Sequence, residues 1–334
     1  GAGRPPDYGA NGIQDCGGGY THDGEFILVA EDGASDLKNY PVQYVNGRIW
    51  VNNHAHVLQA KKEIADNKFL KYVISQTNIE PYLVGGGRAK LNADTMMRIF
   101  IIAPENLEEQ KQLGTLFQRL DNLTTLHQRK LLKLKNIKKA MLEKMFPKNG
   151  SNVPEIRFGG FTDAWEQRKL GNLTQIKTGS SDLQDSVEDG QYPFFVRSEN
   201  IERSNRYIFD GEAILIPGEG RLGDIYHYIN GKFDFHQRVY KISGFEDSNT
   251  DGKYILYYMQ KNFKQHAMRF TVKATVDSLR LPMLTDFDVV VPKIEEQRKI
   301  SNLFANLDSL ITLHQRKYEK LQNLKKACLQ KMFV

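Results

Sequence analysis

One stretch of about 40 residues occurs twice in this chain, and this duplication limits the possible folds more than any other feature. Residues 107–146 return as residues 294–333 at a constant offset of 187 positions, without a gap. Roughly six positions in ten are identical, which chance does not give, so the chain is an internal duplication. Its function must therefore be interpreted from two similar halves.

Each copy has the pattern of one long helix. Apolar residues, with one histidine in each copy, recur every seven positions on one face of the helix, and the opposite face is polar. This pattern is typical of a helix that packs along another helix. The first row is Leu113, Leu120, His127, Leu134, Met141 and then Ile300, Leu307, His314, Leu321, Cys328; the second row is Leu116, Leu123, Ile137 and Leu303, Leu310, Leu324. At 1.5 Å per residue each helix is about 55–60 Å long. The pair is either an ordinary helical hairpin or a rigid ruler that holds two domains apart.

Composition limits the number of domains, the kinds of partner and the cellular compartment that we expect. The 334 residues suffice for two or more domains, and 46 Lys and Arg against 40 Asp and Glu give a formal charge of +6, which is compatible with nucleic acid. The two cysteines, Cys16 and Cys328, form no disulfide framework and no metal spacing. With no apolar run long enough to span a membrane and no signal peptide, we expect a cytoplasmic protein without membrane contact.

Residues 1–103 have a mixed α/β pattern. We expect a buried strand within 23–34, two strands around an Asn-Gly hairpin at 42–51, a helix at 66–76, a glycine-rich loop at 85–88, a short helical segment near 92–97 and a strand at 98–103. Residues 147–157 form a linker rich in Pro, Gly, Asn and Ser.

The second half repeats this scheme. Residues 210–217 match the first buried strand, 229–235 match the Asn-Gly segment, 253–268 are again helical, and 288–292 are again a strand followed by Pro. Residues 154–179 have no equivalent, because the second half holds about 35 residues before the position that matches Gly1. We therefore interpret the first domain as N-terminally incomplete. The chain also lacks an initiator Met, as expected of a fragment.

Three motifs together carry a family resemblance. The opening RFGGFTDAWEQRKLGNL at 157–173, the EEQ helix starts behind a proline, and LHQRK followed by KMF resemble the specificity subunit of type I restriction–modification systems. The resemblance implies an α+β architecture in which two α/β target recognition domains are joined by two long antiparallel helices. These helices would form a coiled coil with an internal pseudo-twofold repeat. The implied limits are 1–103 for the first recognition domain, 104–147 for the central spacer helix, 148–291 for the second recognition domain and 292–334 for the C-terminal spacer helix.

The same resemblance implies partners and a non-catalytic role. Each domain would read one half of a bipartite sequence in double-stranded DNA. The helices would dock two methyltransferase subunits and, through the assembly, the restriction subunits. This chain would bind no cofactor, and S-adenosylmethionine would belong to the partner methyltransferase.

The residues themselves show no catalytic constellation. We find no adenine-methylase motif, no Walker A motif and no zinc motif. Residues 218–223 match G-x-G-x-x-G, but a dinucleotide site needs a helix next, and a strand pattern follows instead. A tight turn from a strand into a loop is therefore the better interpretation.

Loops that follow the predicted strands supply the candidate DNA-reading residues. Base readout needs Arg, Lys, Asn, Gln or short acidic side chains that can enter a groove. In the second domain the candidates are Arg197, Ser198, Asn200, Glu219, Arg221, His236, Gln237, Arg238, Lys273 and Thr275. In the first domain they are Tyr8, Asn11, Asp32, Asn52, Asn53, His54, Arg88 and Lys90. Any one of them can also be an ordinary solvated side chain or ion-pair partner.

The LHQRK motifs supply the candidate partner-binding residues His127, Arg129, Lys130, His314, Arg316 and Lys317. The two histidines fit equally a polar seam that fixes helix register. Two other interpretations of the chain stay open. One is a truncated specificity protein that dimerises, and the other is a coiled-coil scaffold that does not bind DNA.

Overall fold

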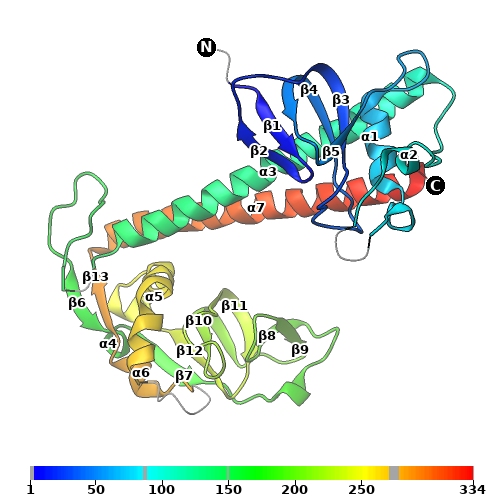
Figure 1. Ribbon diagram of the computed structural model, residues 1–334. Coiled ribbons are helices and arrows are strands. Elements are labelled where there is room, and N and C mark those ends of the chain that lie inside the picture. Colours follow the sequence, from blue (N-terminus) through cyan, green and yellow to red (C-terminus); the bar gives the residue numbers. More distant parts are fainter. Residues whose placement is uncertain (1–3, 86–88, 149, 271–277, 334) are drawn as a thin grey trace. The chain divides into compact units, whose positions relative to one another are not determined.

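The computed structural model describes residues 4–85, 89–148, 150–270 and 278–333 and divides into two compact units (Figure 1). Unit 1 comprises Gly1–Lys130 and His314–Val334, and unit 2 comprises Leu131–Leu313. Each unit therefore combines one α/β body with parts of both long helices.

Unit 1 is built on a five-stranded sheet in the order β2-β1-β4-β3-β5. Its strands are β1 (Pro6–Gly9), β2 (Gly12–Cys16), β3 (His22–Ala30), β4 (Val42–Val51) and β5 (Ala55–Leu58). Strands β1 and β4 run parallel, and the other neighbours run antiparallel. Helix α1 (Asn67–Gln76) follows, with the Asp66 carboxylate capping it by accepting from the Phe69 backbone N–H at 2.9 Å. The 3₁₀ turn Glu80–Tyr82 and the short α2 (Ala93–Met96) complete the body.

Unit 2 has a six-stranded sheet in the order β7-β12-β10-β11-β8-β9 and a separate β13-β6 pair. The strands are β6 (Glu166–Lys169), β7 (Gln175–Thr178), β8 (Tyr192–Phe195), β9 (Ile201–Ser204), β10 (Phe209–Pro217), β11 (His227–Phe235), β12 (Val239–Ser243) and β13 (Asp288–Val291). The helices are α4 (Leu170–Leu173), α5 (Gly252–Ala267) and α6 (Leu281–Thr285), with 3₁₀ turns at Leu183–Asp185, Glu246–Ser248 and Met268–Phe270. Strands β9-β8-β11-β10-β12 repeat the order of unit 1, and β7 is an addition at the edge.

The Asn-Gly segment is not a hairpin, and that prediction was wrong. Strand β4 is continuous through Gly47, which pairs with Gly24 of β3, and in unit 2 Gly231 of β11 pairs with Gly211 of β10. All four glycines have φ between 107° and 142°, which a residue with a Cβ rarely adopts. The glycines therefore bend a paired ribbon instead of turning one strand back.

The bend has a geometric consequence in unit 2. Residues 236–238 join the end of β11 to the start of β12, and four Cα steps reach at most about 14 Å. However, the end of β11 lies beside Phe209, the first residue of β10, whereas the start of β12 lies beside Pro217, the last residue of β10. In a straight strand Phe209 and Pro217 would lie about 26 Å apart. The β10–β11 ribbon must therefore curl, and the curl brings the end of β11 to the end of β10.

The predicted strand at 98–103 does not form either. Among the described residues, Phe100–Ala103 belong to no β-ladder, whereas the matching β13 pairs with β6 in unit 2. Strand β6 lies in the stretch that has no equivalent in the first half. The sequence pattern of a strand is present in unit 1, but a pairing strand is not found among its described residues.

The two long helices form as predicted, as α3 (Leu107–Met145) and α7 (Ile294–Met332). They pack side by side in antiparallel directions within each unit (Figure 1). In unit 1 the ring centroids of Phe117 and Phe333 lie 5.3 Å apart, and in unit 2 those of Phe146 and Phe304 lie 5.7 Å apart. Phe117 matches Phe304 and Phe333 matches Phe146 at the offset of the duplication, so both units use the same contact.

The second row of the heptad pattern was only partly right. Leu123 and Leu310 are 44% and 43% exposed, and Leu116 and Leu324 are also exposed, whereas Leu120, Ile300 and Leu307 of the first row are buried. The seam is therefore narrower than predicted, and an apolar row remains on the surface of each unit.

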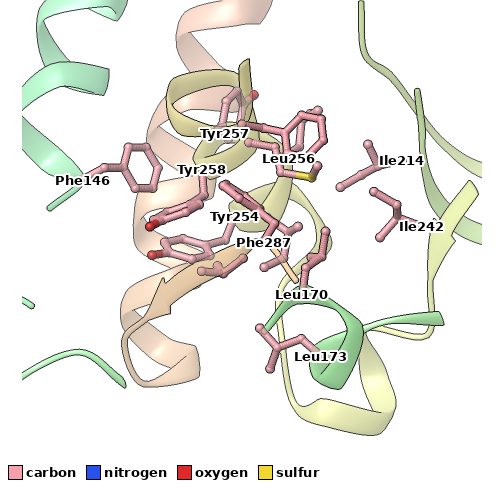
Figure 2. Packing of buried hydrophobic residues seen from close by; sticks show 14 of the residues in the cluster. Phe146, Leu170, Leu173, Ile214, Ile242, Tyr254, Leu256, Tyr257, Tyr258 and Phe287 are labelled. Atoms are coloured by element: carbon pink, nitrogen blue, oxygen red, sulfur yellow. The ribbon is translucent and has the colours of Figure 1, made fainter. Parts of the chain in front are cut away.

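Partly buried polar contacts tie each α/β body to the helices. In unit 1 the Tyr72 hydroxyl donates to Asp121 at 2.7 Å, and in unit 2 the Tyr257 hydroxyl donates to Asp308 at 2.8 Å. Lys325 pairs with Asp121, and its equivalent Lys138 donates to Asp308 at 2.6 Å. Around this contact in unit 2, Tyr257 and Tyr258 of α5 pack in the hydrophobic core (Figure 2).

Candidate nucleic-acid interface

Three loops of unit 2 meet where β8, β10 and β11 end. The Gly218 backbone N–H donates to the Arg238 carbonyl at 2.8 Å, which joins the loop after β10 to the connection after β11. The His227 ring lies 3.1 Å from the Ser198 carbonyl and adds the loop after β8. Predicted residues from positions 197–238 thus lie on one surface, which we call the unit 2 loop surface and define by Arg197, Glu219, Arg221, Gln237 and Arg238.

Acidic side chains hold the arginines of this surface. Glu219 accepts from Arg197 at 3.0 Å and also pairs with Arg238, while Arg221 pairs with Glu199. The hydrogen bonds from Arg238 and Arg197 hold the pKa of Glu219 below its usual value, so the carboxylate stays charged. The side chains of Arg197 and Arg238 remain 46% and 58% exposed. They are oriented by the protein and still open to a ligand.

The neighbouring candidates have different positions. His236 is only 2% exposed, and its ring accepts from the Arg238 backbone N–H at 2.9 Å, so it shapes the connection and offers no ring edge to a ligand. The Gln237 amide donates to Asp182 at 3.0 Å. Asn200 is exposed, and its backbone N–H donates to the Ser198 hydroxyl at 3.2 Å in a local turn. Lys273 and Thr275 lie outside the described residues.

Unit 1 assembles its candidates in the same way. The Glu31 backbone N–H donates to the His54 carbonyl at 2.9 Å, and the Leu91 N–H donates to the Glu31 carbonyl at 2.7 Å. Side chains of the same segments are also in contact: the His54 ring lies 2.7 Å from the Asp32 carboxylate, and the Lys90 ammonium lies 2.8 Å from the Glu31 carboxylate. We define the unit 1 loop surface by Asn11, Asp32, Asn53, His54 and Lys90.

An acid–base pair occupies the same place in both units with different residues. Asp32 and Glu219 lie two positions after the ends of β3 and β10, respectively. His54 and Arg238 come directly before β5 and β12, the strands that pair with β3 and β10. The pair is Asp32–His54 in unit 1 and Glu219–Arg238 in unit 2. The backbone frame is therefore repeated, while the side chains that it presents differ.

Two asparagines of unit 1 support the loops with their amides. The Asn11 amide donates to the Gly33 carbonyl and accepts from the Ser35 N–H, both at 2.8 Å. The Asn52 amide donates to Gln14 at 3.2 Å and accepts from the His54 N–H at 2.9 Å. Asn53, which follows Asn52, is exposed. Tyr8 is half-buried, and burial raises its pKa. Arg88 lies outside the described residues.

Sequence reasoning missed the acidic partners Glu31, Asp182 and Glu199. Glu31 directly adjoins the candidate Asp32, and Glu199 lies between the candidates Ser198 and Asn200, so a search for acids beside candidate loop residues would have found them. Asp182 lies 55 positions before Gln237 and gave no such signal.

The predicted partner-binding residues lie on α3 and α7. His127 and His314 face each other, with their Nδ1 atoms 2.8 Å apart, so the histidines belong to the helix seam. Burial, and then the charge of His314, lowers the pKa of His127. Arg129, Lys130, Arg316 and Lys317 are exposed, and no ion pair joins them to another described residue.

Neither a metal site nor a membrane span is found in the part of the chain that the structure describes. Three or more His, Cys, Asp or Glu side chains do not gather there as metal ligands. None of the described helices combines the length and apolar character that a membrane span requires.

Comparisons with known proteins point to one family. A family model described as the type I restriction modification DNA specificity domain matches residues 4–136 and 162–323. A type I restriction enzyme specificity subunit from Haemophilus influenzae is 42% identical over 124 residues, 37% of this chain and 32% of that protein. The specificity subunit of the type I restriction enzyme EcoDI from Escherichia coli is 31% identical over 149 residues, 43% of this chain and 32% of that protein. These two matches each span about a third of the relative's length.

A solved structure shares the fold. The crystal structure of a type I restriction–modification S subunit from M. genitalium aligns with a TM-score of 0.76 at 14% identity, covering 100% of this chain and 89% of that one.

Proposed function

The chain belongs to the family of type I restriction modification DNA specificity domains, and from this premise we propose that it selects the DNA sequence on which a modification complex acts. One observation supports the proposal above the others: the two units repeat one backbone frame and present different polar side chains on equivalent loop surfaces. A chain that reads two different half-sites needs such an arrangement, because the frame sets the docking and the side chains set the bases.

The side-chain types on both surfaces fit direct readout. Exposed guanidinium groups such as those of Arg197 and Arg238 can donate two hydrogen bonds to guanine, and Asn53 and Gln237 can pair with adenine. Glu219 keeps two guanidinium groups in fixed orientations, which lowers the entropy lost on binding. Since acids balance the arginines here, we assign these groups to sequence selection and expect phosphate contacts to come from other basic side chains.

The helices account for a bipartite target. In each unit α3 and α7 pack antiparallel, and each helix extends without interruption through 39 residues. We propose that together they form a coiled-coil spacer with an internal pseudo-twofold repeat, whose length sets the gap between the half-sites. Within this proposal, residues 1–103 and 148–291 are the recognition domains and the helices are the spacer.

The surface of the helices offers docking sites for partners. Leu123 and Leu126 of unit 1 and their equivalents Leu310 and Leu313 of unit 2 are each 43–45% exposed, which leaves an apolar row beside the basic LHQRK motifs. We propose that each row docks one methyltransferase subunit and that restriction subunits join through these. The methyltransferase would supply S-adenosylmethionine and flip the target adenine out of the duplex, while this chain supplies no catalytic group.

The proposal is tested by selecting from a random DNA duplex library with the chain bound to its methyltransferase partner. We expect two conserved sequence blocks separated by a fixed gap. Arg238→Ala should change one block and Asn53→Ala the other, while Arg298→Ala, an exposed substitution on α7, should change neither. Affinity should fall steeply with salt, because bound phosphates displace counterions. A complex that recovers no sequence and shows a flat salt dependence would indicate a scaffold.

A further inference from the structure

One carboxylate of unit 2 lies fully buried in a hydrogen-bond network. Asp234 of β11 is 0% exposed, and its carboxylate accepts four hydrogen bonds. The donors are the Ser181 hydroxyl, the Ser204 hydroxyl at 3.1 Å, the Arg206 Nε atom at 3.3 Å and the Phe235 N–H at 2.8 Å. A charge taken out of water costs free energy unless hydrogen bonds and a counter-ion compensate it, and both are present here. The donors are therefore held in fixed positions around the carboxylate.

The network also fixes the turn that carries Asp182. The Ser181 hydroxyl donates to Asp234 and accepts from the Arg206 Nη2 atom at 2.8 Å. The same Nη2 atom donates to the Asp185 carboxylate at 3.1 Å. Asp185 in turn accepts from the Asp182 N–H at 2.8 Å. Both ends of this turn are thus tied to the buried carboxylate.

The turn lies directly against the connection from β11 to β12. The Gln237 N–H donates to the Ser181 carbonyl at 2.9 Å, so the two segments are joined through their backbones. A Cβ on Gly179 would lie 1.9 Å from the Phe235 carbonyl oxygen, so the approach leaves no room for a side chain there. On this support the Gln237 amide donates to the Asp182 carboxylate at 3.0 Å.

The bond to Asp182 gives the Gln237 amide one orientation. The hydrogen bond from the Leu183 N–H holds the pKa of Asp182 below its usual value, so the carboxylate stays charged and can only accept. A flipped amide would turn its carbonyl oxygen towards this carboxylate and lose the hydrogen bond. A glutamine amide has two N–H donors and one acceptor, so one N–H and the carbonyl oxygen of Gln237 are left for a ligand. Adenine in the major groove presents the matching N7 acceptor and N6 donor.

Unit 1 has a different residue at the position of Asp234. Trp50 and Asp234 each lie three residues after the paired glycine of their strand. Both pair with a parallel neighbour, Trp50 with Asp7 of β1 and Asp234 with Phe194 of β8. Trp50 carries no carboxylate and is 43% exposed. The buried carboxylate is therefore a property of unit 2.

The residue of unit 1 that matches Gln237 is Asn53. The side chain directly before each of them accepts from the backbone N–H directly after it, at 2.9 Å in both units. Asn53 is exposed, and its amide makes no hydrogen bond to another described residue. Both units thus present an amide at the same place of one backbone frame, but only in unit 2 does a carboxylate from the described residues hold it.

We propose that Asp182, fixed through Ser181 by the buried Asp234, is a positioning residue that makes Gln237 select adenine at one position of its half-site. This inference rests on the proposed function, because it deepens the base readout assigned to the unit 2 loop surface. The amide of Asn53 can present its donor and its acceptor in either order. Unit 1 should therefore discriminate less between bases at the equivalent position.

The test repeats the selection from a random duplex library with the chain bound to its methyltransferase partner and compares base frequencies position by position. Gln237→Ala identifies the position that this amide reads. Asp182→Ala should lower the preference for adenine at that position alone by about tenfold, the order of one base contact through two hydrogen bonds. A variant with both changes should show no further loss. Asp189→Ala, which removes an exposed carboxylate from the same segment, is the matched control and should change no position.

A second pair of variants separates positioning from stability. Ser181→Ala and Ser204→Ala each remove one hydrogen bond to Asp234, but only Ser181 adjoins Asp182. We expect both variants to lower the urea midpoint of unit 2. Only Ser181→Ala should also relax the preference for adenine.

Three results would overturn the inference while two enriched sequence blocks remain. One is an unchanged preference for adenine in Asp182→Ala. Another is an equal loss of affinity for every sequence in that variant, because Asp182 would then only support the fold. The third is a preferred base other than adenine at the position that Gln237→Ala changes. A wild-type complex that enriches no sequence would instead overturn the proposed function and this inference together.

Discussion

Removing the Arg157 side chain should destabilise unit 2 far more than an exposed charge change nearby. Glu296 is fully buried and accepts two hydrogen bonds from Arg157, whose side chain is 13% exposed. Breaking a buried ion pair by removing one partner costs about 3–5 kcal/mol, because the remaining charge is left without compensation. Since some water reaches Arg157, we expect Arg157→Ala to lower the free energy of unfolding by about 3 kcal/mol.

The chain offers a local reporter for this measurement. It has two tryptophans, and Trp165 of unit 2 is 2% exposed while Trp50 of unit 1 is 43% exposed. In a Trp50→Phe background, the fluorescence of Trp165 follows the urea unfolding of unit 2 alone. With a urea slope of about 2 kcal/mol per molar, a loss of about 3 kcal/mol lowers the midpoint by about 1.5 M.

A control and a refutation follow from the same helix. Glu295 adjoins Glu296 but is exposed, so Glu295→Ala should change stability by less than about 0.5 kcal/mol. If Arg157→Ala shifts the midpoint no more than Glu295→Ala does, the buried ion pair does not hold residues 157–173 in place.

Three further predictions concern pH, the helix seam and the spacer. Although burial acts to raise it, the hydrogen bonds from Lys325 and Tyr72 hold the pKa of Asp121 below its usual value, so this group stabilises unit 1 above about pH 4 and the stabilisation is lost as pH falls. Urea unfolding of Asp121→Asn should therefore depend less on pH below 4 than that of the wild type, and an unchanged dependence would refute the assignment. Burial, and then the charges of His314, Lys317 and Lys130, lower the pKa of His127 in the folded protein. The unfolded chain therefore binds a proton at this histidine more readily than the folded chain does, and unit 1 should lose stability as pH falls below about 6.5. His127→Gln should flatten that loss in thermal unfolding, and an equal loss in the variant would contradict it. Deleting one heptad from both α3 and α7 should shorten the gap in the selected DNA while leaving both half-sites the same, and an unchanged gap would exclude the spacer role.

The sequence predicts the helices well because their signal is local and occurs twice. A heptad row fixes the face of a helix wherever its partner lies, so the bounds of α3 and α7 come within a residue of prediction. The Asn-Gly segment fails for the opposite reason. Gly47 and Gly231 need their positive φ to bend a paired strand, and only the glycine across the ladder distinguishes that bend from a hairpin.

The candidate site also contains features with a local sequence signal and features that depend on distant residues. Loops after strands are predictable, so Arg197, Glu219 and Arg238 are each predicted as loop residues, and the structure brings them together. His236 lies in the same connection but is buried, and Asp182 comes from a distant segment, so neither role can be read from nearby residues. The strand at 98–103 fails because strand formation needs a partner edge, which the sequence of the strand itself does not contain.

The most direct test of sequence selection is long-read sequencing of methyl-adenine in a host that carries the partner methyltransferase, with and without this chain. We predict that a two-part asymmetric motif with a fixed gap becomes methylated only when the chain is present, and that Arg238→Ala alters one part alone. Identical methylation with and without the chain would contradict the account.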